Sequence, residues 1–354
     1  MKSKDNITEM IDYLRSTDNG NPLFDEDRII AAYQKQGVPQ TLPVKMMAIF
    51  GGLLTSLAFS GFLVITGIYQ SVYGLLGFGV TCIIAAIWIN NKYNKVILDT
   101  LSISSFIIGL ILLWFGLDQL GVHENLRYLI YSILSLCSLL STRGYILNFA
   151  AIFIMNGSIL ALILSTRSYS LMQIYVSSLT VLLYFFLRQE AGIIHMKKTF
   201  SAQYTPIRAG LVFSFLSGLV YLGKRGLIPL SMGYTWVTSM LIITAIAFLM
   251  STLLPILKIK RTMHKVCAYT LTIVILLPTV SSPAISGAVL LMLLSFLVNY
   301  RTGFVISIIA LVYFISQYYY DLNLTLLIKS VLLASSGISF LLIYFFFLKN
   351  IDNK

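Results

Sequence analysis

The stretch GLLGFGVTCIIAAIWINNKYNKVILDTLSISSFIIGLILLWFGL, residues 74–117, decides the class of fold. It contains two long apolar runs, and the polar segment between them carries Lys92 and Lys95. An α-helix needs about 20 apolar residues to cross a bilayer, and each run approaches that length. Charges gathered in short clusters between apolar runs are what membrane topology requires. The stretch therefore predicts two membrane-spanning helices with a basic connection.

The rest of the chain repeats this pattern. Of its 354 residues, 58% are hydrophobic and 11% are charged, whereas a soluble domain carries about 25% charged residues. The apolar runs lie at approximately 46–69, 71–90, 97–117, 127–142, 145–165, 170–187, 209–223, 235–257, 264–280, 284–300, 302–320 and 325–348. The fourth and seventh are the weakest, which leaves ten or eleven helices open as alternatives. We predict an all-α fold, a polytopic transmembrane helical bundle of about twelve helices.

Positive charge indicates how the bundle is oriented. With the N-terminus and every second connection on one side, that side receives 17 of the Lys and Arg residues. The other side receives four, which are Arg127, Arg167, Lys224 and Arg225. Cytoplasmic loops carry the excess of Lys and Arg, so both termini are expected in the cytoplasm. The formal net charge of +12 thus reflects membrane topology, and no nucleic-acid partner is expected.

The pattern divides the chain into three parts. Residues 1–45 are polar and form a short cytosolic segment, with helices expected in NITEMIDYLRS (6–16) and DEDRIIAAYQKQ (25–36). Residues 46–348 form the transmembrane domain, and residues 349–354 form a cytosolic tail. The longest cytoplasmic loop is expected between Arg188 and Arg208. Forty-five residues are too few for a robust core, so we expect the first part to be a docked appendage.

A polar stripe marks the last predicted helix. At 100° per residue, five positions fall within an arc of about 80°, namely Asp321, Thr325, Lys329, Ser336 and Ser339. A lysine at membrane depth is costly, so Lys329 is expected to face other helices or a wet cavity. Three interpretations stay open: a lysine that reaches the interface, a buried ion pair, or a charge in a transport site. The stripe is the candidate functional site.

Residues that commonly carry chemistry are scattered. Neither the three cysteines nor the three histidines show metal-ligand spacing, at Cys82, Cys137, Cys267, His123, His195 and His264. No nucleophile elbow, HExxH motif or phosphate-binding loop occurs in the sequence. We therefore expect no cofactor, no metal and no catalytic activity.

Other polar and small residues suggest helix packing. The glycines of YGLLGFG (73–79) and the serines of SILSLCSLLS (132–141) permit close approach between helices. Asp99 lies four residues after Lys95, where an ion pair is expected to reduce its insertion cost. Asp118 and Glu124 lie beside His123 and Arg127 in an external loop, where they can form a small polar rim.

The closing stretch FISQYYYDLNLTLLIKSVLLASSGISFLLIYF (314–345) carries a family resemblance. The features are three tyrosines, an Asp/Leu-rich turn, a Leu-Leu-x-Lys-Ser run and a small-residue helix, at Tyr318, Tyr319, Tyr320, Asp321, Leu326, Leu327, Lys329, Ser330 and Gly337. In these features the chain resembles the bacterial family called domain of unknown function 4401. The resemblance implies a multi-pass protein of the bacterial inner membrane. It also implies a small membrane-anchored partner protein, named for a Gly-Asp-Tyr motif.

Two functional hypotheses follow. The first is a non-catalytic subunit or scaffold of a cell-envelope membrane complex, with the lipid bilayer and a small membrane-anchored protein as partners. The alternative is a transporter or lipid flippase with a cavity lined by the last helix, at Lys329, Ser336 and Ser339. Twelve helices with both termini inside also occur in transporters, but that likeness concerns the fold alone.

Overall fold

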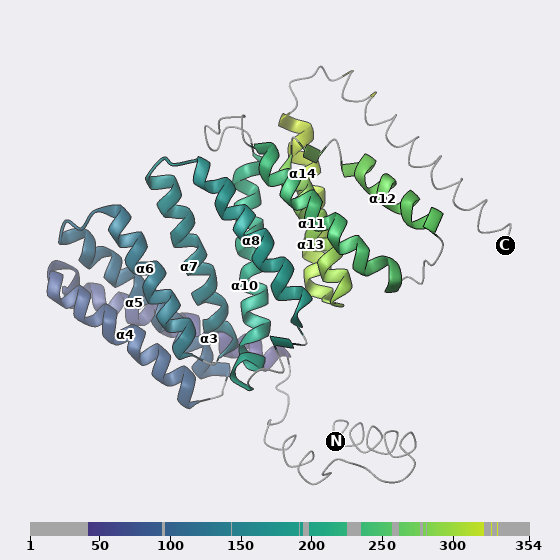
Figure 1. Cartoon of the computed structure of the whole chain (residues 1–354). Helices are drawn as coiled ribbons and strands as arrows, with labels where there is room; N and C mark the ends of the chain where they lie inside the picture. The colour runs from purple at the N-terminus through teal and green to yellow at the C-terminus, as the bar shows by residue number, and fades with distance from the viewer. Residues whose placement is uncertain are drawn as a thin grey trace, which may run out of the picture.

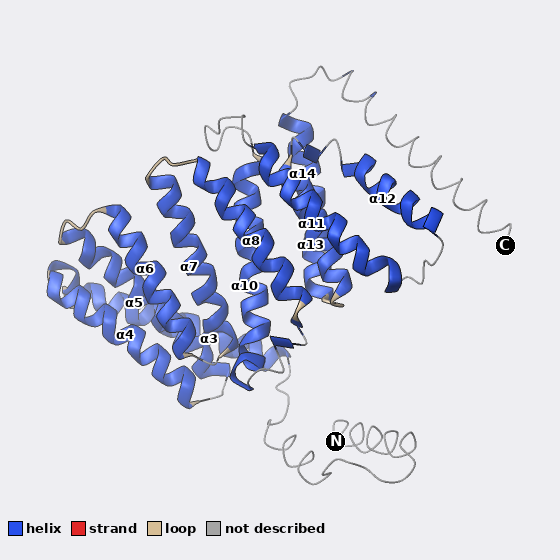
Figure 2. Ribbon diagram, viewed as in Figure 1, coloured by secondary structure: helices blue, strands red, loops and turns tan. Residues whose placement is uncertain are grey.

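The computed structural model describes residues 42–321, apart from 94–95, 143, 191, 194–197, 225–234, 257–261, 277–278 and 281, and also residues 327 and 331. Every element in these residues is a helix, and none is a strand (Figures 1 and 2). The predicted all-α class is confirmed. The helices expected within residues 1–41, most of the twelfth apolar run and the C-terminal tail lie outside the described residues.

Each of the first eleven predicted runs coincides with one helix. The helices are α3 (Leu42–Ile65), α4 (Val72–Lys92), α5 (Val96–Gln119), α6 (Glu124–Ser141), α7 (Tyr145–Ser165), α8 (Ser170–Arg188), α10 (Lys198–Gly223), α11 (Thr235–Ile256), α12 (Thr262–Leu276), α13 (Pro283–Leu297) and α14 (Arg301–Asp321). A short 3-10 helix, η1 (Ile68–Gln70), joins α3 to α4. The count of twelve stays a prediction.

The boundaries differ most at α10. The apolar run predicted a start at residue 209, but the helix begins at Lys198 and contains Pro206. The predicted long loop between Arg188 and Arg208 is therefore partly helical. Hydropathy misses residues 198–208 because it detects only apolar side chains. The backbone hydrogen bonds of a helix do not depend on apolar side chains, so the helix can extend beyond the apolar run.

Tight reversals join several neighbouring helices. Gly121 follows α5 with φ +71°, its N–H donates to the Asp118 carbonyl, and the Val122 N–H donates to the Leu117 carbonyl. This pair of bonds is the Schellman motif, in which a left-handed residue ends a helix. Asn299, with φ +53°, ends α13 in the same way, which is why α13 stops before the predicted residue 300. These reversals set consecutive helices side by side.

The helices pack as a bundle in which successive helices largely run up and down beside one another (Figure 1). Contacts link α4 with α5, α6 with α7, α7 and α8 with α10, α11 with α13, and α13 with α14. The largest core lies among α7, α8, α10, α11 and α13 and includes the fully buried Phe215. A second core joins α4 to α7 around Phe106, and a third holds α3 through Leu63.

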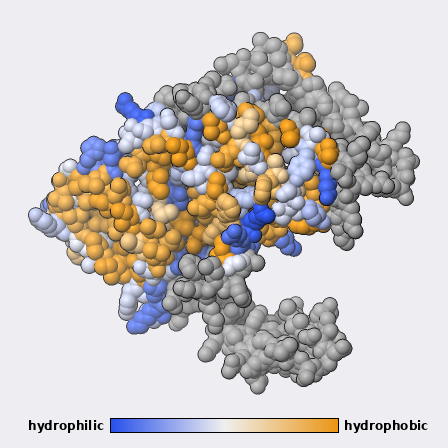
Figure 3. Space-filling model, viewed as in Figure 1, coloured by the Kyte–Doolittle hydropathy of each residue, from blue (hydrophilic) through white to orange (hydrophobic). Residues whose placement is uncertain are grey.

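The exterior of the bundle is apolar. Figure 3 shows hydrophobic side chains over most of the visible face, with hydrophilic ones gathered toward helix ends. Seven helices in the described residues are long and apolar enough to cross a membrane: α4, α5, α7, α8, α10, α11 and α14. The seventh run, which was predicted to be weak, is α10, and α10 has the lowest mean hydropathy of these seven helices. The fourth run is α6, which falls outside the seven and carries Glu124, Asn125 and Arg127 near its start.

Helices α4 and α5 pack closely enough for their backbones to meet. A Cβ on Gly109 would lie 2.8 Å from the Gly79 carbonyl oxygen. The Ser102 and Ser105 hydroxyls, both on α5, donate to the backbone of α4 at 2.6 and 3.0 Å. Close packing was the predicted role of the YGLLGFG glycines, and Gly79 fills it. Gly77 does not, because a Cβ there would meet nothing within 4 Å.

The serines of α6 divide in a similar way. Ser135 and Ser138 are buried, which agrees with the predicted close approach of helices. Ser135 makes no interhelical hydrogen bond, because its hydroxyl is buried and finds no partner among the described residues. Spacing along a helix predicts which face a serine occupies but not whether an acceptor stands opposite.

A Gly109→Ala substitution should destabilise the protein. The added methyl would meet backbone of α4, and overpacking of this kind costs about 1–3 kcal/mol. Gly77→Ala is the matched control, since its methyl meets open space and alanine favours a helix by about 1 kcal/mol. Thermal unfolding in detergent measures both variants. Equal melting temperatures for Gly109→Ala and Gly77→Ala would contradict the close contact.

Candidate functional sites at the two ends of the bundle

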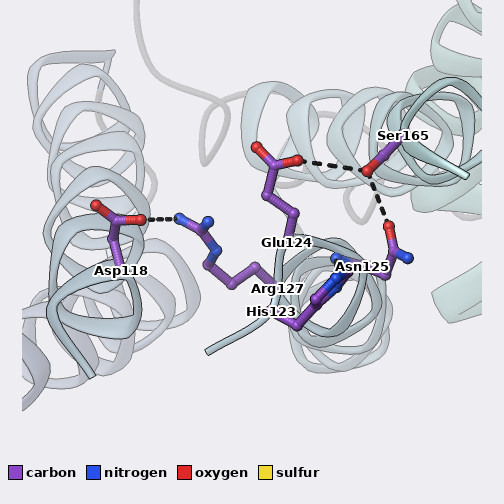
Figure 4. Close-up of polar contacts among 6 residues, drawn as sticks. All are labelled: Asp118, His123, Glu124, Asn125, Arg127 and Ser165. Atoms are coloured by element: carbon purple, nitrogen blue, oxygen red, sulfur yellow. Dashed lines mark hydrogen bonds and ion pairs between the residues drawn. The ribbon is translucent and has the colours of Figure 1, made fainter. Parts of the chain in front are cut away.

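The predicted polar rim forms at the end of the bundle where α5 stops and α6 begins (Figure 4). The Schellman turn at Gly121 ends α5 and so returns the chain beside Asp118. His123 then caps α6, because its Nδ1 accepts a hydrogen bond from the Asn125 N–H at 3.3 Å. Glu124 is the first residue of α6, where a carboxylate interacts favourably with the helix dipole.

Arg127 is the centre of this rim. Its Nη1 donates to Asp118 Oδ1 at 2.7 Å, and its guanidinium carbon lies 4.5 Å from the centre of the Trp114 ring. The Arg127 side chain is 9% exposed, whereas that of Asp118 is 59% exposed. The Nε of Arg127 is buried and finds no partner in the described part of the chain. A buried guanidinium therefore depends on one half-exposed carboxylate and one aromatic face.

A third helix joins the rim through the last residue of α7. The Ser165 hydroxyl donates to Asn125 Oδ1 at 2.8 Å, and the Ser165 Oγ also lies 3.4 Å from Glu124 Oε2. Figure 4 shows Asp118, the start of α6 and Ser165 arriving from three separate helices. The rim thus fastens α5, α6 and α7 to one another.

The opposite end holds a second polar cluster, around the connection between α6 and α7. Asn91 of α4 donates to the Ser141 carbonyl at 2.7 Å. Asn90 accepts from the Gly144 N–H at 2.9 Å. Gln203 of α10 donates to the Thr142 carbonyl at 2.6 Å. Side chains of two other helices therefore satisfy backbone groups that a helix end leaves without partners.

Residue 144 must be a glycine because the Asn90 side chain occupies the space that a Cβ would need. A Cβ there would collide with the Asn90 amide. Asn90 Nδ2 also lies 3.5 Å from Asp99 Oδ1, so the described neighbour of Asp99 is an amide of α4. The expected partner Lys95 lies outside the described residues. Sequence reasoning missed the roles of Asn90, Asn91 and Gln203. Their hydrogen-bond partners lie far away along the chain, and an uncharged amide gives no signal in the sequence that points to a particular partner.

Arg208 forms the third polar contact, at the same end as the α6–α7 connection. Its Nη1 donates to Glu190 Oε1 at 3.2 Å, and its guanidinium carbon lies 3.9 Å from the centre of the Tyr300 ring. Burial raises the pKa of the Tyr300 phenol, which stays neutral beneath the cation. The sequence predicted Arg208 only as one of the flanking positive charges. Its partners come from the residues just after α8 and from the α13–α14 turn.

The predicted stripe is described only at its first residue. Asp321 ends α14 and accepts a hydrogen bond from Gln317 Nε2 at 3.0 Å. Thr325, Lys329, Ser336 and Ser339 lie outside the described residues, so the stripe stays a prediction. Within the described residues, no group of three or more His, Cys, Asp or Glu side chains is placed to hold a metal ion.

Comparison with known proteins gives one match. A family model described as domain of unknown function (DUF4401) matches residues 41–350, which include every described helix. No curated protein and no solved structure matches the chain.

An Asp118→Asn substitution should destabilise the rim. It leaves the Arg127 guanidinium, 9% exposed, without its counter-ion. Breaking a buried pair costs about 3–5 kcal/mol and an exposed pair about 0–1 kcal/mol, so we expect a loss of about 1–3 kcal/mol for this half-exposed one. Thermal unfolding in detergent measures the loss, with the exposed Arg167→Gln as control. Unchanged stability of Asp118→Asn would show that the pair contributes nothing.

Proposed function

The chain belongs to the DUF4401 family, and from its structure we propose that it is a non-catalytic subunit or scaffold of a cell-envelope membrane complex. The observation that carries the proposal is that the main polar side chains bond to neighbouring helices. The Arg127 rim, the amides around the α6–α7 connection and the Arg208 contact each join helices to one another. Side chains used in this way fix the shape of a bundle.

The apolar exterior supports the same proposal. Large hydrophobic side chains are exposed on several helices, for example Leu57 at 68%, Ile84 at 60% and Ile309 at 64%. In a membrane protein, such surfaces face lipid or the helices of a partner. A fixed bundle with broad apolar faces suits a component that holds other membrane proteins in place.

The proposal includes a location and a partner. The excess of Lys and Arg on one side favours a multi-pass protein of the inner membrane with both termini in the cytoplasm. The rim around Arg127 then faces outward, and the amides around the α6–α7 connection face the cytoplasm. The partner that we propose is the small membrane-anchored protein implied by the family resemblance.

Labelling of single cysteines tests the orientation. In a background without Cys82, Cys137 and Cys267, a membrane-impermeant maleimide should label Arg167→Cys in intact cells. Lys92 is exposed at the C-terminal end of α4, on the predicted cytoplasmic side. Lys92→Cys should therefore react only after the membrane is permeabilised. The reverse pattern would place both termini outside and contradict the proposed topology.

Purification tests the proposed complex. The tagged full-length chain, cross-linked in cells and extracted in mild detergent, should carry a small membrane-anchored protein in stoichiometric amount. A tagged multi-pass protein of similar size is the control for non-specific capture. Recovery of the chain alone, with and without cross-linking, would rule out the subunit hypothesis.

A further inference from the structure

Helix α4 carries an exposed stripe that changes in character along its length. Ile84, Trp88 and Lys92 follow one another at intervals of four residues, so they lie on one face of the helix. Ile84 is 60% exposed and Trp88 is 55% exposed, and Lys92 is exposed as well. The helix lies at the edge of the bundle (Figure 1) and packs mainly on α5. Over about 12 Å of helix, the stripe passes from an apolar side chain through an amphipathic ring to a positive charge.

Two aromatic rings hold the charged end of the stripe. The backbone becomes extended at Tyr93, whose N–H still donates to the Ile89 carbonyl. The Tyr93 ring then meets the Trp88 ring edge to face, with 6.2 Å between the ring centres. The Lys92 Nζ lies 4.6 Å from the centre of the Trp88 ring and 5.7 Å from that of the Tyr93 ring, where the ring electrons attract a cation. No carboxylate in the described part of the chain pairs with Lys92.

Neighbouring contacts fix this end of α4 in place. Asn90 accepts a hydrogen bond from the Gly144 N–H, and Asn91 donates one to the Ser141 carbonyl. These two amides lie about 200° and 100° round the helix from Lys92, so they attach α4 to the α6–α7 connection without covering the lysine. A cation without a counter-ion is therefore held at a fixed position, next to exposed apolar surface.

The order of side chains along the stripe matches the order of groups along a phospholipid. Acyl chains are apolar, amphipathic rings such as that of Trp lie at the level of the headgroups, and basic side chains attract anionic lipids. The rings also restrict the kind of headgroup. Aromatic faces attract the quaternary ammonium of choline, but the Lys92 ammonium already covers the Trp88 ring. An anionic headgroup is therefore favoured over a choline headgroup.

We propose that Ile84, Trp88, Lys92 and Tyr93 form a binding site for one anionic phospholipid. The lipid phosphate lies on the Lys92 ammonium, and the acyl chains lie along Trp88 and Ile84. The inference goes beyond the proposed scaffold function, and it holds whichever end of α4 faces the cytoplasm.

Quenching of tryptophan fluorescence in vesicles tests the proposal. The full-length chain keeps Trp88 as its single tryptophan, through Trp114→Phe and Trp236→Phe, and is reconstituted in phosphatidylcholine. Phosphatidylglycerol or phosphatidylcholine, each brominated in its acyl chains, is then added in increasing fractions. Brominated phosphatidylglycerol should reach the same quenching at an about fivefold lower fraction, the factor expected for one basic residue at an anionic surface. Equal quenching by the two brominated lipids would overturn the proposal.

Substitutions of lysine distinguish a site from general attraction of anionic lipid. Lys92→Gln should abolish the preference for phosphatidylglycerol, whereas Lys92→Arg should retain it. Lys224→Gln is the matched control, because Lys224 is exposed just after α10 at the opposite end of the bundle, and it should leave the preference unchanged. Brominated phosphatidylcholine should quench all four proteins equally, which checks that Trp88 still meets acyl chains. A preference that survives Lys92→Gln, or that Lys224→Gln removes to the same extent, would refute the site.

Discussion

The bundle depends on the cost of leaving a polar group without a partner in an apolar medium. In hydrocarbon each unsatisfied backbone or side-chain group costs several kcal/mol, so its partners must come from the protein. The structure meets this demand at the ends of its helices. There the Arg127 guanidinium finds Asp118 and Trp114, and the carbonyls that end α6 find Asn91 and Gln203.

The same constraint explains what occupies the middle of the helices. Hydroxyl groups there are small and often bond to the carbonyl one turn back, as Thr180 and Ser214 do. Others reach across a close contact, as Ser102 does from α5 to α4. Neither arrangement needs a cavity. The polar groups with long side chains are instead placed where several helices end together.

The sequence predicts the helices well because a helix that lies in a bilayer must have mostly apolar side chains, which hydropathy detects. All eleven described runs are helical, and their errors are at the ends, where Lys198–Arg208 continues a helix through polar residues. The rim at Asp118 and Arg127 was predictable because its members are neighbours in one hairpin. Gln203 and the α6–α7 connection are 61 residues apart, and Arg208 and Tyr300 are further apart still. Contacts of this kind depend on which helices pack together, which hydropathy does not determine.

Helix α6 has a consequence for how the protein enters the membrane. Its early residues Glu124, Asn125 and Arg127 make it less apolar than its neighbours, and it is fastened at both ends. Asp118 and Asn91 are synthesised before α6, but Ser165 and Gln203 emerge only later. A helix of this composition gains little from lipid on its own. The stability of α6 in the bilayer is therefore supplied in part by α7 and α10, so its final placement is a late step in assembly despite its early place in the chain.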